Sequence, residues 1–227
     1  MKSNFLPKSR YEEMYIVEEY PLKTKLAPVH SKKSESPVAV KAAETLRRLL
    51  QPSLPFPNNK KMASDFGNVI TKWMKCQTWK ATQPAVNLPF IHTFAFNEKI
   101  PLYQCWRLKV SITRKRNDLL ELHIPSFIPR EIMWAPGGTT SIECIISIAS
   151  CTLQTGTANG SVIYPFTVPY HNNEIASQSA EISIPTPEGS LIIGAASLNY
   201  IVSENGNLIH RSEEECLPAG VIASMYI

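Results

Sequence analysis

The stretch SLIIGAASLNYIVSENGNLIH, residues 190–210, decides the fold. Residues 190–202 are a long apolar run, and residues 207–210 are a short one. Asn205-Gly206 stands between them, and this dipeptide favours the two-residue turn of a β-hairpin because both of its residues tolerate positive φ. The stretch therefore predicts two antiparallel strands joined by a tight turn.

Neighbouring segments repeat this pattern of strands and turns. In QCWRLKVSIT, residues 104–113, one face is mainly apolar and the other mainly polar, which is typical of a half-buried strand. Further strands are expected at residues 118–125, 140–150, 161–169, 181–185 and 220–227, with turns at 116–118, 136–138, 158–160 and 187–189. No helical periodicity interrupts these strands. The sequence therefore predicts a mainly β fold over residues 81–227, an antiparallel β-sandwich of the immunoglobulin-like or jelly-roll-like kind.

Two helices are predicted ahead of the sandwich, within residues 36–80. Ser36-Pro37 is typical of a helix start, because serine caps free backbone amides and proline fits the first turn. Apolar residues at helical spacing then predict helices over residues 37–51 and 60–76. They are Val38, Ala42, Leu46 and Leu49 in the first helix, and Met62, Phe66, Val69, Trp73 and Met74 in the second. Pro52 is expected to end the first helix.

Residues 1–35 are interpreted as an extended N-terminal arm. They contain three prolines, several charged pairs and one short apolar run, Met14 to Val17, which is too small to form a core. Fully extended, such a segment reaches about 115 Å, and its tyrosines provide contact area along that length. A segment of this kind is ordered when something holds it, and a sister copy of the chain is the expected holder.

The overall composition is that of a globular protein. The 227 residues are 44% hydrophobic and 19% charged, and no apolar run is long enough to span a membrane as a helix. Charge is divided unevenly: residues 1–116 carry 21 Lys and Arg against 8 Asp and Glu, and residues 117–227 carry 2 against 11. This asymmetry favours head-to-tail contact between copies of the chain.

The order of elements resembles a family of uncharacterised domains common in Bacteroidota. The shared features are the helix VAVKAAETLRRLLQPSLPF at residues 38–56, the hairpin ASLNYIVSENGNLI at 196–209 and the closing strand GVIASMYI at 220–227. The chain departs from the family near its start, where a glycine-rich segment and an arginine-rich strand would be expected. The resemblance implies a sandwich with a helical pair and no known enzymatic activity.

No catalytic signature is found in the sequence. The five cysteines include no C-x-x-C pair, the five histidines are far apart, and no phosphate-binding loop, nucleophile elbow or metalloprotease motif occurs. We therefore expect a protein that is not an enzyme and that has no cofactor, no metal and no small-molecule substrate. The N-terminus shows no secretory signal, so the expected location is the cytoplasm or a virion.

The predicted function is that of a structural subunit that self-associates through arm exchange into a larger particle or filament, with a phage or virus component as the expected source. The arm would supply apolar anchors, and a basic turn of one copy would face an acidic run of the next. The candidate interface residues are Tyr11, Tyr15, Ile16, Val17, Arg114, Lys115, Arg116, Glu213, Glu214 and Glu215.

Two alternatives stay open. The basic N-terminal half, with a basic strand that includes Arg107 and Lys109, favours a nucleic-acid-associated protein. The third interpretation is a carbohydrate-binding sandwich, in which Trp79, Trp106 and Trp134 would provide stacking platforms.

Overall fold

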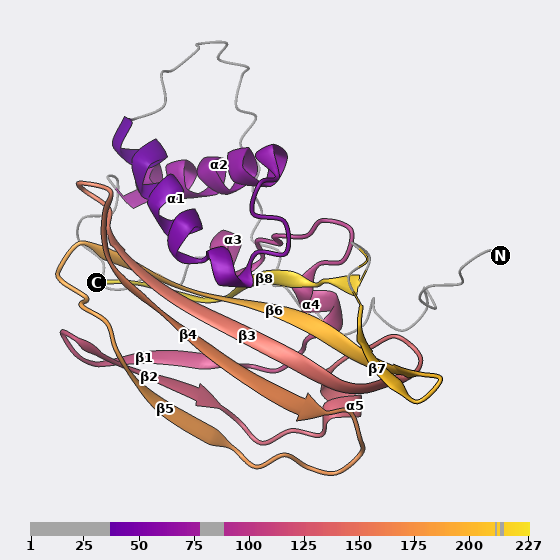
Figure 1. The fold of residues 1–227 in the computed structure, drawn as a ribbon. Helices are drawn as coiled ribbons and strands as arrows, with labels where there is room; N and C mark the ends of the chain where they lie inside the picture. The colour runs from indigo at the N-terminus through magenta and orange to yellow at the C-terminus, as the bar shows by residue number, and fades with distance from the viewer. Residues whose placement is uncertain (1–36, 78–88, 212, 214–215) are drawn as a thin grey trace, which may run out of the picture. The chain divides into compact units, whose positions relative to one another are not determined.

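Two antiparallel β-sheets and a layer of helices build the described part of the chain (Figure 1). The computed structural model describes residues 37–77, 89–211, 213 and 216–227. The candidate residues Tyr11, Tyr15, Ile16, Val17, Glu214 and Glu215 lie outside the described residues.

The large sheet contains five strands: β3 (Thr139–Thr152), β4 (Thr157–Pro169), β6 (Ser190–Glu204), β7 (Asn207–His210) and β8 (Ala219–Tyr226). β3 pairs with β4 along one edge and with β6 along the other. The far edge of β6 is shared, because β8 pairs with its first half and β7 with its last four residues. The predicted hairpin is confirmed: Asn205 and Gly206 have φ of 53° and 81°, as a type I′ turn requires.

The small sheet has the order β1 (Ser111–Arg116), β2 (Leu119–Ile124) and β5 (Gln178–Ser183). It faces the large sheet across a core of alternating side chains, such as Leu120 and Leu122 from β2 and Ile142 and Ile146 from β3, which are all buried. Burial of these inward-facing side chains stabilises the fold by about 25 cal/mol for each Å² of apolar area removed from water. The predicted antiparallel two-sheet sandwich is therefore confirmed.

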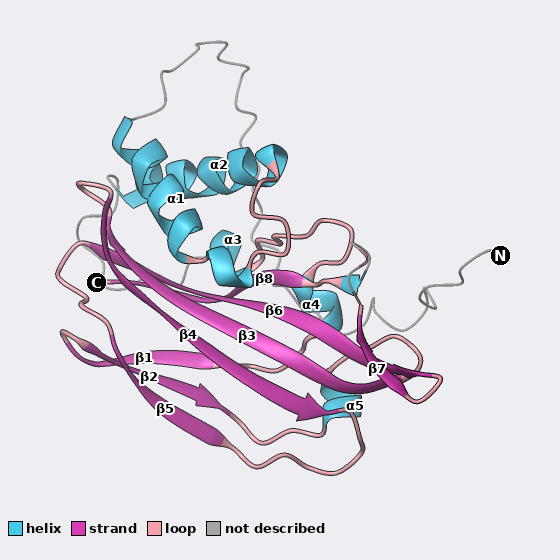
Figure 2. Ribbon diagram, in the orientation of Figure 1, coloured by secondary structure: helices cyan, strands magenta, loops and turns pink. Residues whose placement is uncertain are grey.

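Helices cover the other face of the large sheet (Figure 2). They are α1 (Pro37–Leu49), α2 (Lys60–Gln77) and the short α3 (Pro89–His92), with a 3₁₀ turn, η1 (Gln51–Ser53), after α1. Both predicted long helices are confirmed. Leu46, Phe66 and Trp73 are at most 1% exposed and pack with Ala149 and Ile193 of the sheet. The helical pair and the sandwich thus share a hydrophobic core within one compact unit, Glu35–Ile227.

A buried serine links the helical layer to the sheet. The hydroxyl of Ser53 donates to Ser147 Oγ at 2.8 Å and lies 3.1 Å from the carbonyl oxygen of Ile145. Pro52, which was expected to end the first helix, lies inside the η1 turn that brings Ser53 to β3.

The strand predicted over residues 104–113 is wrong in its first half. Residues Leu102–Cys105 form a helical turn, α4, in which the Trp106 amide donates to the Leu102 carbonyl at 2.8 Å, and β1 begins only at Ser111. The turn places Trp106 in the core between the sheets, where it is 5% exposed. A second short helix, α5 (Pro129–Ile132), and α3 also interrupt a region in which only strands were expected.

The turn predicted at residues 158–160 is also wrong, because these residues belong to β4 and the chain turns at 153–156. Asn159, which suggested a turn, instead donates its side-chain amide to Ser150 Oγ at 3.1 Å and to Ser190 Oγ at 2.9 Å. Gly156, with φ of 64°, provides the turn, and a Cβ there would meet the backbone nitrogen of Ala42 at 3.0 Å.

Candidate functional site

The basic turn at the end of β1 is largely occupied by contacts within the chain. Arg114 Nη2 donates to Asn117 Oδ1 at 2.7 Å and to the carbonyl oxygen of Thr186 at 2.9 Å. These bonds stabilise the turn between β1 and β2 and tie it to the segment after β5. Arg114 therefore acts as a structural residue of the small sheet.

Lys115 is also paired. Its Nζ lies 2.8 Å from Glu121 Oε2 on the outer face of the small sheet, and the hydrogen bond from Lys115 lowers the pKa of the Glu121 carboxyl below its ordinary value. Arg116 is exposed at the end of β1 and takes part in no ion pair among the described residues. Of the three basic candidates, Arg116 alone is available to a partner without breaking an existing contact.

The acidic candidate Glu213 pairs with a neighbouring arginine. Arg211 Nη1 lies 3.1 Å from Glu213 Oε1, and Arg211 Nη2 lies 2.8 Å from Glu204 Oε1. This cluster follows β7, whereas the turn after β1 lies at the opposite side of the view in Figure 1. The fold therefore does not bring Glu213 together with the basic candidates within one chain.

Three of the sheet edges carry residues that discourage further strand pairing. β4 contains Pro165 and Pro169, and a strand proline has no N–H to offer at the open edge. β1 ends in the charged residues Lys115 and Arg116, and β5 carries an exposed Glu181. Charged and proline residues on edge strands are the usual means by which proteins avoid association through sheet edges.

The edge of β7 lacks such residues. The four residues Asn207–His210 contain neither proline nor lysine, and Leu208 and Ile209 are 70% and 42% exposed. Leu208 is the most exposed of the large apolar side chains in the described part of the chain. We call Asn207–His210 the β7 edge.

Backbone groups on the β7 edge are open to pairing. The Arg211 amide donates to the Tyr200 carbonyl at 2.9 Å, and Ile209 lies opposite Val202. In an antiparallel pair, every second residue bonds to the partner strand through its N–H and C=O groups. Ile209 and Arg211 bond to β6, so the N–H and C=O groups of Leu208 and His210 face away from it. No strand in the described part of the chain pairs with them. The sequence NLIH predicts a strand at residues 207–210, but only the order of strands in the sheet shows that this strand is an open edge.

Potential nucleophiles are buried in the two cores. Burial raises the pKa of the Cys105 thiol to about 12 and that of Cys151 to about 11, so both thiols stay protonated at neutral pH. In the part of the chain that the structure describes, no group of three His, Cys, Asp or Glu side chains is placed to hold a metal ion. Nor does any helix there have the length and apolar character needed to cross a membrane.

The tryptophans considered as stacking platforms are packed against other side chains. Trp106 is 5% exposed and meets Phe166 edge to face, with ring centroids 6.4 Å apart. Trp134 is half-buried and packs edge to face against Tyr200, whose hydroxyl donates to the Trp134 carbonyl at 2.9 Å. Trp79 lies outside the described residues.

A comparison of the chain with protein-family models gives no match, and neither does a comparison with curated proteins.

Proposed function

We propose that the protein is a structural subunit of a larger particle or filament, and that the N-terminal arm of one copy adds a strand to the β7 edge of the next. The observation that supports this proposal most is the β7 edge itself, which has free backbone groups and an exposed Leu208, whereas the edges formed by β1, β4 and β5 carry charges or prolines. Strand addition to such an edge combines backbone hydrogen bonds with apolar side-chain contacts.

The arm contains a segment that suits this edge. Residues 14–17, MYIV, are four uncharged residues, of which Tyr, Ile and Val have high β propensity, and β7 is four residues long. Glutamate pairs flank the segment on both sides, at residues 12–13 and 18–19. Charges at both ends limit the added strand to these four residues and oppose uncontrolled aggregation of the arm before it docks.

The proposed contact joins two different surfaces of the chain, the arm of one copy and the β7 edge of the next. An arm and a sheet edge are different surfaces, so the contact is heterologous, and repeating it yields a ring or an open filament. We assign the main contact between copies to the apolar residues of the arm. The charged candidates Arg114, Lys115 and Glu213 already have partners within their own chain. β-Sandwich folds are common building blocks of viral capsids, which supports a phage or virus particle as the assembly.

Deletion of residues 1–35 tests the proposal. The truncated chain should keep the circular dichroism and urea midpoint of the compact unit but elute as a monomer, whereas the full chain assembles. A synthetic peptide of residues 11–20 should bind the truncated chain, and Leu208→Lys in that chain should weaken the binding by about 5- to 30-fold. Assembly that is unchanged by the deletion would refute the arm model.

A further inference from the structure

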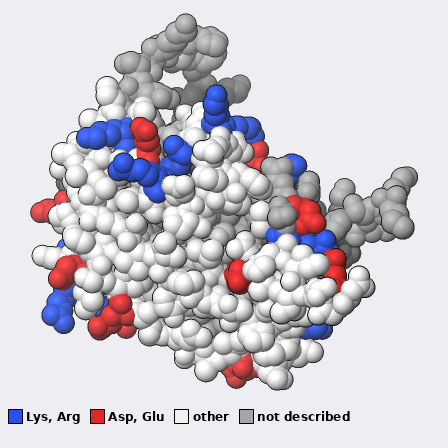
Figure 3. Space-filling view, viewed as in Figure 1, with Lys and Arg blue, Asp and Glu red and all other residues white. Residues whose placement is uncertain are grey.

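The helical layer carries a strongly basic surface. Residues 37–77 contain seven Lys and Arg against two Asp and Glu, and Figure 3 shows the blue side chains gathered over the helices. In the rest of the described chain acidic residues slightly outnumber basic ones. The basic half noted in the sequence therefore becomes, in the fold, a basic helical face.

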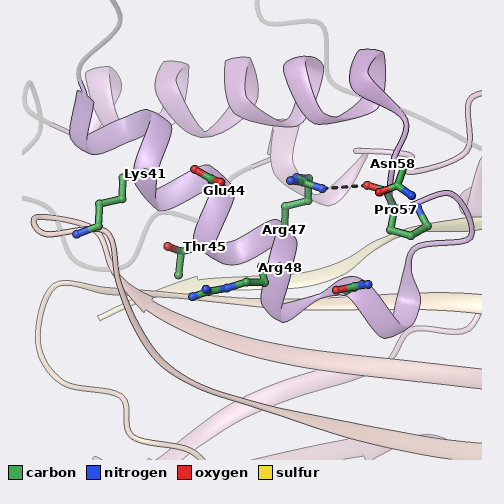
Figure 4. Close-up of a pocket in the computed structure, with 8 residues that line it drawn as sticks. Lys41, Glu44, Thr45, Arg47, Arg48, Pro57 and Asn58 are labelled. Atoms are coloured by element: carbon green, nitrogen blue, oxygen red, sulfur yellow. Dashed lines mark hydrogen bonds between the residues drawn. The ribbon is translucent and has the colours of Figure 1, made fainter.

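A cavity of about 480 Å³ lies beside α1 within this surface (Figure 4). We call it the α1 pocket. Its lining is polar, with seven polar or charged residues and one proline: Lys41, Glu44, Thr45, Arg47, Arg48, Gln51, Pro57 and Asn58.

The walls of the α1 pocket are held by hydrogen bonds. Arg47 Nη1 donates to the Pro57 carbonyl at 2.9 Å and fixes the loop after η1 against the helix (Figure 4). Thr45 Oγ1 donates to the Gly156 carbonyl at 3.0 Å and fixes the turn between β3 and β4 below it. These hydrogen bonds hold the backbone around the pocket in place before a ligand binds, so binding loses little free energy to ordering these segments.

Two cations in the pocket are uncompensated. Lys41 and Arg48 are exposed, and neither forms an ion pair with any described residue. They are seven residues apart on one face of α1, which corresponds to a rise of about 10 Å, and both extend away from Asn58 in Figure 4. Glu44, one turn from each, is the single carboxylate of the lining.

We propose that the α1 pocket binds the phosphate backbone of nucleic acid. An exposed guanidinium and an exposed ammonium in the lining of an open pocket match phosphate oxygens, and the amides of Gln51 and Asn58 are neutral donors in the same lining. An acidic peptide fits less well, because peptide docking relies on buried apolar anchors and Pro57 is the single apolar residue of the lining.

The same lining indicates how the nucleic acid is recognised. No aromatic side chain lines the pocket, so unpaired bases have no surface on which to stack, which favours a duplex over a single strand. Lys72 and Lys75 are exposed on α2, so the helical layer carries further positive charge outside the pocket. Several cations on one layer favour a polymer with repeated phosphates over a free mononucleotide.

Fluorescence anisotropy with a labelled 20-base-pair DNA duplex tests the proposal on the full chain. Lys41→Gln with Arg48→Gln should weaken binding at least tenfold at low salt. It should also reduce the slope of log K against log salt by about 1.8, since each phosphate contact contributes about 0.9. Glu44→Gln should strengthen binding several-fold, because it removes the one negative charge of the pocket.

The matched control is Lys115→Gln with Arg116→Gln, which removes the same charge from β1 and should change the affinity less than twofold. Equal losses in both double variants would overturn the proposal, because net charge alone would then explain the binding. So would unchanged binding by the Lys41 and Arg48 variant. Repeating the titration with Leu208→Lys separates pocket affinity from the avidity of an assembly.

Two competitors identify other ligands. Displacement of the duplex by the peptide of residues 11–20 would assign the pocket to the arm instead. Displacement by adenosine monophosphate at micromolar concentration would assign it to a small phosphate ester. The proposal expects neither compound to compete below the millimolar range.

Discussion

Replacing Leu208 by lysine should separate assembly from folding. Leu208 is 70% exposed in the isolated chain, so only about a third of its side chain is buried by the fold. Full burial of a leucine contributes about 1.5–3 kcal/mol, and the substitution should therefore lower the free energy of unfolding by less than about 1 kcal/mol.

Docking of an arm strand would cover the exposed remainder of the side chain. That area corresponds to about 1–2 kcal/mol per contact, or about a 5- to 30-fold change in the association constant. Lysine also introduces the charge that other edges of the protein use against pairing. Each contact in a ring or filament is weakened equally, so the concentration at which assembly begins should rise by at least that factor.

Sedimentation velocity over a concentration series measures this shift, with urea denaturation to confirm the fold. Ile163→Lys is the matched control, because Ile163 is 49% exposed on β4, an edge strand that contains prolines. The control should assemble as the unsubstituted chain does. If Leu208→Lys assembles at the same concentration as the unsubstituted chain, the β7 edge is not the docking site.

Three further predictions concern the stability of the fold and the edge of β4, which contains two prolines. Ser53→Ala should lower the free energy of unfolding by about 1–2 kcal/mol in urea titrations, because it leaves the buried Ser147 hydroxyl without its 2.8 Å partner; an unchanged midpoint would contradict this. Replacing Pro165 and Pro169 together by valine should restore N–H donors on the edge of β4 and produce new association of the chain in light scattering, and a particle size equal to that of the unsubstituted chain would count against the role of these prolines. Stability should fall as the pH rises above about 9, since the unfolded Cys151 thiol loses its proton near 9.0 while the folded thiol holds it up to a pKa of about 11; urea titrations at pH 8 and 10.5 should show a smaller decline for Cys151→Ala, and an equal decline would refute the assignment.

Sequence periodicity was sufficient for the elements whose burial is regular. α1 and α2 bury one helical face each, and β3 and β6 are long strands that pair in one register from Ser141 to Thr152, so local pattern and tertiary packing agree. The Asn205-Gly206 turn is specified by the conformational freedom of its own two residues and needs no tertiary information.

The errors arose where tertiary contacts override the local pattern. Residues 104–113 alternate like a strand, but the helical turn at Leu102–Cys105 is needed to bury Trp106 between the sheets. Asn159 is of a residue type that is common in turns, but in the fold its side-chain amide donates hydrogen bonds to Ser150 and Ser190 of neighbouring strands. Neither partner is adjacent in sequence, so periodicity alone does not show them.

The surfaces proposed for binding were only partly visible in the sequence. The charges of Lys41 and Arg48 can be read from the sequence, but the pocket also needs the loop that Arg47 holds through Pro57. The basic residues at the end of β1 stand out as a run, yet two of the three are engaged within the chain. Availability of a charge depends on its partners, and these are set by the sheet register.

Self-assembly of the full chain is the central claim, and light scattering coupled to size exclusion measures it most directly. Recording the 260/280 nm absorbance ratio on the same peak shows whether nucleic acid is bound. The proposal predicts a species several times larger than the 25.4 kDa chain, which shifts to a monomer on deletion of residues 1–35. A monomer of the full chain at every concentration tested would contradict it.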